Sequence, residues 1–123
     1  MGSTQTFTLE NFPIEPGLCN SSYSAISRAM YSRYSRDLPG IRESGLYGTH
    51  AFYNPKADEI LPVLFGTLYS GTEYAEVLFY QAQNQSKGKL EVKLFGEDEK
   101  RLLEIKNNIQ FRLNNILESR KNG

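Results

Sequence analysis

The sequence predicts an α+β fold in which an antiparallel sheet of about four to five strands packs against an N-terminal helix and a long C-terminal helix. Apolar residues alternate with polar ones through much of residues 46–95, whereas they recur at helical spacing in residues 22–38 and 97–120. The length of 123 residues is typical of one domain, so we expect residues 1–123 to form a single unit.

Residues 1–17 are expected to form an extended arm or an edge strand. Polar and apolar residues alternate over residues 6–9, and Pro13 and Pro16 then remove backbone hydrogen-bond donors and fix the local φ angle. The arm carries four apolar side chains that could pin it either to the body of the same chain or to a neighbouring subunit: Phe7, Leu9, Phe12 and Ile14.

A helix is predicted over residues 22–38. The polar residues 20–22 (Asn-Ser-Ser) offer side-chain oxygens to its first backbone amides, and Pro39 with Gly40 should end it. Its apolar stripe, which should hold it to the core, consists of Tyr23, Ile26, Met30 and Tyr34.

Four extended segments should build the sheet, because turn-forming residues separate four apolar runs. Their expected bounds are Leu46–Tyr53, Ile60–Tyr69, Tyr74–Gln83 and Leu90–Phe95. The last segment has the clearest alternation. Its residues 90, 92 and 94 are apolar and should face the core, whereas Glu91 and Lys93 should face the other way.

The segment at residues 60–69 is apolar on both faces, which predicts a central strand that is covered on both sides. Pro62 predicts an edge position or a bulge near its start, and Gly66 predicts a second irregularity. The segment at residues 74–83 repeats this pattern more weakly. We therefore expect the second face of the sheet to be covered by the N-terminal helix or by a partner chain.

The C-terminal helix, residues 97–120, has the strongest helical signal in the chain. Acidic residues occupy positions 97–99 and basic residues occupy positions 120 and 121, as the helix dipole favours. The stripe that should pack on the sheet consists of Leu102, Ile105, Ile109, Leu113 and Ile116, with Phe111 and Leu117 beside it.

Charge and cysteine content restrict the classes of function. The 14 basic residues balance the 14 acidic ones, so any binding of an anion must be local, and the low net charge favours self-association. A single cysteine, Cys19, and the lack of a signal-peptide pattern predict a reducing, cytoplasmic location. The longest apolar run, residues 60–65, is too short to cross a membrane.

Motifs for catalysis, cofactors and metals are weak. His50 is the only histidine, so a nucleophile-and-base pair would need it, with Cys19 as the only thiol. Glycine-rich phosphate loops and zinc-ligand spacings are missing from the sequence. We expect no cofactor, no metal site and no catalytic residue.

The best candidate for ligand binding is a stretch rich in arginine and tyrosine that begins in the N-terminal helix. Arginine binds phosphate groups through two parallel hydrogen bonds, and tyrosine rings stack on nucleobases. The candidate residues are Arg28, Tyr31, Arg33, Tyr34, Arg36 and Arg42. The alternative interpretation is a solvated helix face on which Arg33 pairs with Asp37.

Three hypotheses follow. The first is a non-enzymatic binding module, oligomeric through self-association, that holds an anionic small molecule or a nucleotide with these arginines and tyrosines. The second is an assembly or regulatory domain that binds a protein partner through the apolar sheet region. The third is a small enzyme centred on His50. A membrane partner is not expected.

Overall fold

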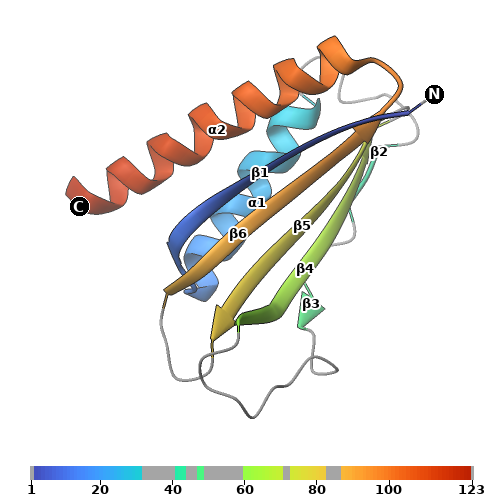
Figure 1. The fold of residues 1–123 in the computed structure, drawn as a ribbon. Helices are drawn as coiled ribbons and strands as arrows, with labels where there is room; N and C mark the ends of the chain where they lie inside the picture. Colours follow the sequence, from blue (N-terminus) through green and yellow to red (C-terminus); the bar gives the residue numbers. More distant parts are fainter. Residues whose placement is uncertain are drawn as a thin grey trace.

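Two helices lie on one face of an antiparallel sheet in the computed structural model, which describes residues 2–31, 41–43, 47–48, 60–70, 73–82 and 87–122 (Figure 1). The sheet order is β1-β6-β5-β4-β2, and β3 also pairs with β4. The predicted α+β architecture is confirmed. The strands are β1 (Ser3–Pro13), β2 (Ile41–Glu43), β3 (Tyr47–Gly48), β4 (Ile60–Ser70), β5 (Glu73–Ala82) and β6 (Lys87–Gly96), and the helices are α1 (Pro16–Tyr31) and α2 (Glu99–Asn122).

The N-terminal arm is an edge strand that packs on its own chain. β1 pairs with β6 along its whole length, and the register shifts between Glu10 and Phe12. Asn11, at this shift, has a φ of 54°, a left-handed conformation that asparagine tolerates better than most residues. The extra residue at this bulge shifts the alternation of inward-facing and outward-facing side chains by one position. Both Phe7 and Phe12 are therefore buried in the core.

Helix α1 begins at Pro16, earlier than the predicted start at Ser22. Proline suits the first helical position because its missing N–H would have no partner there. The carbonyl oxygen of Glu15 accepts the first helical hydrogen bond, from the Cys19 amide at 2.9 Å. The predicted cap at residues 20–22 is therefore wrong, and Ser22 is fully buried inside the helix. The predicted end at residue 38 lies outside the described residues.

The core face of the sheet follows the predicted alternation. In β6, the apolar residues at positions 90, 92 and 94 are fully buried, while Glu91 and Lys93 are only partly buried. A register shift between Pro62 and Leu64 confirms the bulge predicted at the start of β4. The second irregularity predicted at Gly66 is wrong, because the pairing with β5 is continuous there.

Helix α2 begins at Glu99, after an aspartate cap. The backbone amide of Arg101 donates to Oδ1 of Asp98 at 3.2 Å, and Asp98 is followed by an acidic residue in the first turn. The predicted stripe at residues 102, 105, 109 and 113 is fully buried. Near the other end, Arg120 pairs with Glu15 beside the start of α1. Neither described helix combines the length and the hydropathy needed to cross a bilayer.

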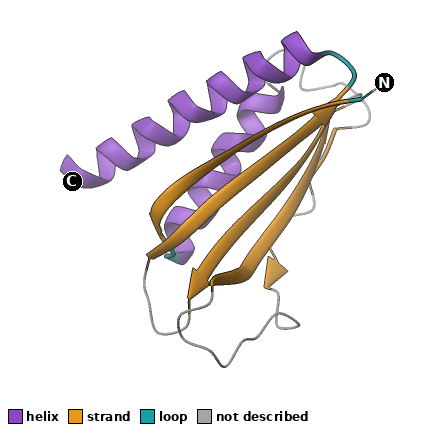
Figure 2. Ribbon diagram, viewed as in Figure 1, coloured by secondary structure: helices purple, strands orange, loops and turns teal. Residues whose placement is uncertain are grey.

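Both helices cover the same face of the sheet and pack side by side on it (Figure 2). The second face was predicted to be covered by the N-terminal helix or by a partner chain, and the first of these alternatives is wrong. Because the buried side of α1 meets both the sheet and α2, its apolar stripe is already used in the common core. The second face, which we call the outer face, keeps Phe65 and Tyr69 exposed.

Candidate functional site

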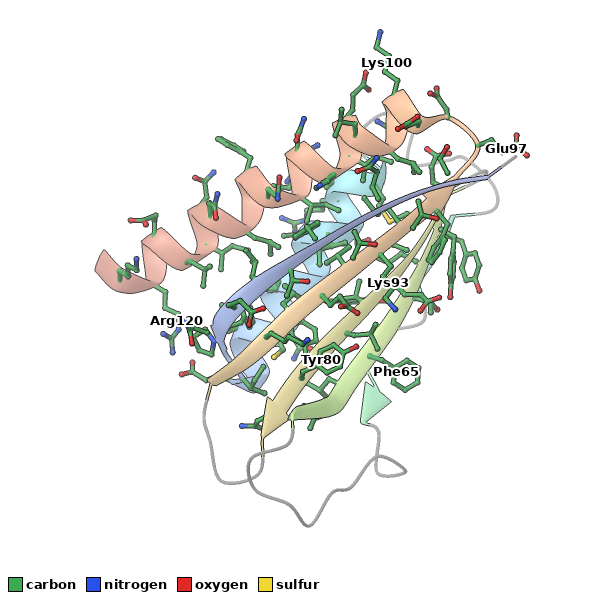
Figure 3. The ribbon with its side chains drawn as sticks, viewed as in Figure 1. Phe65, Tyr80, Lys93, Glu97, Lys100 and Arg120 are labelled. Atoms are coloured by element: carbon green, nitrogen blue, oxygen red, sulfur yellow. The ribbon has the colours of Figure 1, made fainter. Side chains whose placement is uncertain are left out.

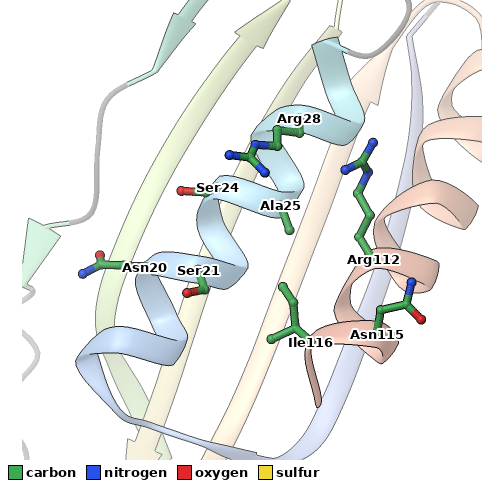
Figure 4. A pocket seen from close by; sticks show the side chains of 8 residues that line it. All are labelled: Asn20, Ser21, Ser24, Ala25, Arg28, Arg112, Asn115 and Ile116. Carbon is green, nitrogen blue, oxygen red and sulfur yellow. The ribbon is translucent and has the colours of Figure 1, made fainter. Parts of the chain in front are cut away.

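A groove of about 600 Å³ lies between α1 and α2 (Figure 4). The polar side of α1 supplies one wall, and the fourth and fifth turns of α2 supply the other. The lining residues are Asn20, Ser21, Ser24, Ala25, Arg28, Arg112, Asn115 and Ile116.

Two arginines from different helices line this groove. Arg28 lies in the last turn of α1 and is exposed, and Arg112 on α2 is partly buried. Their guanidinium groups lie toward the same end of the groove, beside the C-terminal half of α1 (Figure 4). The Nε atom of Arg112 donates to Oδ1 of Asn108 at 2.9 Å, one helical turn earlier. This hydrogen bond helps to fix the orientation of the guanidinium group of Arg112.

The electrostatics of the groove favour an anion. Its described lining residues include no Asp or Glu, so among them the two arginines meet no carboxylate. Ser21 and Ser24 offer hydroxyl groups, and the amides of Asn20 and Asn115 add further donors and acceptors. Ala25 and Ile116 give an apolar patch between these polar groups. A ligand with an anionic end and a flatter, less polar body would match this arrangement.

Among the predicted ligand-binding residues, the structure places Arg28 in the groove and Arg42 elsewhere. Arg42 lies in β2, at the register position opposite Tyr69 of β4, and nothing is described of its side chain. Tyr31 is the last residue of α1, and its side chain is likewise not described. Arg33, Tyr34 and Arg36 lie outside the described residues. Arg28 is thus the predicted residue that the structure places in the groove.

Arg112 is the functional candidate that sequence reasoning missed. It occupies the polar side of a strongly amphipathic helix, where a basic residue is ordinary and gives no signal by itself. Only the packing of α2 against α1 brings it to Arg28, which is 84 positions earlier in the chain.

The outer face of the sheet is a second candidate, because aromatic rings lie next to one another across it. The ring centroids of Tyr69 and Tyr74 are 4.8 Å apart, and those of Tyr74 and Phe95 are 5.6 Å apart. Phe65 projects from the sheet on the side opposite to the helices (Figure 3). The exposed fractions of Phe65 and Tyr69 are 37% and 45%, which is high for aromatic side chains on a β-strand.

Charged side chains lie on the same face of the sheet as these rings. The Tyr80 hydroxyl donates to Oε1 of Glu91 at 3.2 Å, and the Nζ atom of Lys89 lies 4.7 Å from the centroid of the Tyr80 ring. Lys93 forms an ion pair with Glu91 at 3.6 Å. Burial, followed by the charge of Glu91, raises the pKa of the Tyr80 phenol. This part of the face therefore carries both signs of charge, already engaged with neighbours.

The residues considered for catalysis receive little support from their surroundings. His50 lies outside the described residues. Cys19 is a free, fully buried thiol, and burial raises its pKa from 9.0 to about 11, so the thiolate that would act as a nucleophile is scarce at neutral pH. Across the described segments, His, Cys, Asp and Glu side chains form no group of three or more that could hold a metal ion.

Comparison with known proteins found no match to the chain among family models, curated proteins or solved structures.

Proposed function

We propose that this protein is a non-enzymatic binding module that holds an anionic, nucleotide-sized ligand in the groove between α1 and α2. The observation that carries the proposal is that Arg28 and Arg112, from two different helices, line one groove in which the described lining residues include no carboxylate. Arginine side chains bind phosphate and carboxylate groups through two parallel charge-assisted hydrogen bonds, which are roughly twice as strong as neutral ones.

The size and lining of the groove support a small molecule in particular. Its volume of about 600 Å³ falls in the range typical of sites for small molecules and cofactors. The apolar patch of Ala25 and Ile116 suits a base or another flat group, while Ser21, Ser24 and the two asparagines can orient hydroxyl groups of a sugar. Four other predicted residues follow Arg28 in the sequence and stay candidates for binding the same ligand: Tyr31, Arg33, Tyr34 and Arg36.

Binding is favoured over catalysis because the described lining residues provide charge and hydrogen-bond donors, and none of these described residues is a histidine, carboxylate or thiol that could act as a base or a strong nucleophile. We also place the protein in the cytoplasm, since a lone free cysteine suits a reducing compartment.

Isothermal titration calorimetry with ATP, and separately with inorganic pyrophosphate, tests this proposal. We expect saturable binding that weakens with added salt. Loss of one charge-assisted interaction costs about 1.5–3 kcal/mol, so Arg28→Ala and Arg112→Ala should each weaken binding by roughly tenfold or more. Arg112→Lys, which keeps the charge but loses the planar fork, should recover only part of the affinity.

Lys100→Ala is the matched control. Lys100 is an exposed basic residue of α2 that points away from the body of the protein and does not line the groove (Figure 3). Its removal lowers the net charge by the same amount as either arginine variant, yet should leave the affinity unchanged. The proposal is wrong if neither probe binds, or if Lys100→Ala weakens binding as much as Arg28→Ala.

A further inference from the structure

The outer face has the composition of a protein interface, because aromatic side chains cluster on it. Tyr69, Tyr74 and Phe95 form a continuous row at the end of β4, the start of β5 and the end of β6, and Phe65 lies four residues before Tyr69 on the same face of β4. Tyrosine and phenylalanine offer a large contact area at a low entropic cost, since few torsion angles must be fixed on binding. Such residues carry much of the affinity in protein interfaces.

The charges on this face argue against a polyanionic partner. Glu76 of β5 lies opposite Lys93 of β6 in the register, and Lys93 also pairs with Glu91. Lys89 lies against the Tyr80 ring. A nucleic-acid strand or an anionic membrane surface is held by basic residues that are not offset by neighbouring acidic ones. Acidic groups among the rings would repel the phosphates that such a partner brings.

The same distribution of charge suits a second copy of the chain. In a two-fold symmetric dimer a surface meets itself, so a face of a single sign repels its partner, whereas a face that carries both signs can pair with itself. Glu76 and Lys93 are neighbours on β5 and β6, and both are partly buried on this face. A two-fold axis that runs between these two strands and parallel to them would place Glu76 of one copy over Lys93 of the other, and so bring acidic against basic groups.

We propose that the outer face is the surface through which two copies of this chain associate, with Phe65 and Tyr69 at its centre. The aromatic rows of the two copies pack face to face, and the charged groups around them fix the relative orientation of the sheets. This surface lies on the opposite side of the sheet from the groove that contains Arg28 and Arg112, so dimer formation leaves that groove open.

Sedimentation velocity of the full chain over a range of micromolar concentrations, with Phe65→Asp and Tyr69→Asp variants, tests the proposal. The wild-type protein should sediment as a dimer, and each variant should weaken dimerisation by roughly tenfold or more because a carboxylate is then buried in the contact. Phe111→Asp is the matched control. Phe111 is a still more exposed aromatic residue, at 67%, but it lies on α2 on the other side of the molecule.

Three results would overturn the proposal: a wild-type monomer throughout the concentration range, a dimer that persists in both outer-face variants, or a dimer that only Phe111→Asp disrupts. Circular dichroism verifies that each variant is folded. If an aspartate variant does not fold, the milder Phe65→Ser and Tyr69→Ser take its place. Fluorescence anisotropy with a labelled single-stranded RNA tests the competing proposal that this face binds nucleic acid. The dimer proposal would also be contradicted if the wild-type protein were a monomer that binds this RNA tightly and if Tyr69→Ser abolished that binding.

Discussion

The Nε atom of Arg101 on α2 donates a hydrogen bond to Oε1 of Glu73 on β5, across 3.2 Å in the protein interior. The two residues are only 7% and 4% exposed. The Nη2 atom of Arg101 also donates to the carbonyl oxygen of Met30 at 3.1 Å, near the end of α1. One side chain thus joins the start of α2, the start of β5 and the end of α1, and it helps to set the spacing of the two helices that form the groove.

Removal of one partner of this buried pair should be strongly destabilising. Arg101→Met leaves the Glu73 carboxylate without its main counter-charge, and breaking a buried pair in this way costs about 3–5 kcal/mol. Urea denaturation measures the free energy of unfolding. The double variant Arg101→Met with Glu73→Leu should recover much of the loss, since no unpaired charge is then buried. A cost for Arg101→Met alone of less than about 1 kcal/mol would contradict a stabilising role of this pair.

Gly88 should tolerate no side chain, because β5 approaches its backbone closely. A Cβ atom at this position would lie 1.7 Å from the carbonyl oxygen of Tyr80, a backbone atom that cannot move aside cheaply. We expect Gly88→Ala to lower the free energy of unfolding by about 3 kcal/mol or more. Gly17→Ala is the control, since a Cβ atom there meets nothing within 4 Å and alanine favours the helix by up to about 1 kcal/mol. Similar midpoints of thermal unfolding for the two variants would contradict the claim that position 88 has no room for a side chain.

Ser22→Ala should stabilise the protein. The hydroxyl group of Ser22 is fully buried in α1 and has no hydrogen-bond partner among the described residues. A buried polar group without a partner costs roughly 1–3 kcal/mol, and alanine is also the better helix former. The expected gain of about 1 kcal/mol would raise the midpoint of chemical denaturation at an unchanged slope. A loss of stability would show that the hydroxyl group makes a favourable contact.

The Cys19 thiol should be protected at neutral and mildly alkaline pH. Burial raises its pKa to about 11, although a hydrogen bond to the backbone of Glu15 opposes the shift. Because the pKa of Cys19 is higher in the folded protein than in the unfolded chain, the protonated thiol favours the folded state. This contribution to the free energy of unfolding is complete below about pH 9 and is lost as the pH rises toward 11. Alkylation by iodoacetamide at pH 8 should be slow in the folded protein and fast in urea. Equal rates would contradict the burial of the thiol.

Local sequence patterns predicted the fold because each face of its strands and helices is set by short-range periodicity. The alternation at residues 90–94 and the stripe of α2 are examples, and both are buried as expected. The start of α1 was missed because residues 20–22 offer the same hydroxyl and amide groups as a helix cap, whereas the true start depends on Pro16 and the Glu15 carbonyl. Which face of the sheet α1 covers is a tertiary property, and periodicity alone does not encode it.

The candidate groove could be predicted only in part. Arg28 was identified from the local density of arginine and tyrosine, whereas Arg42, in the same stretch, lies in strand β2 of the sheet. Arg112 became a candidate only through the contact between two helices that are distant in the sequence. A binding site assembled from distant elements requires knowledge of their packing.

The most direct test of the groove is a titration with inorganic pyrophosphate, followed through the ¹H–¹⁵N signals of the arginine Nε–Hε groups by NMR spectroscopy. The signals of Arg28 and Arg112 should shift together along saturable curves that give one shared dissociation constant. The signal of Arg120, which pairs with Glu15 outside the groove, should stay nearly unchanged. Arg28 and Arg112 signals that do not move, or that shift no more than the Arg120 signal, would contradict an anion site between the two helices.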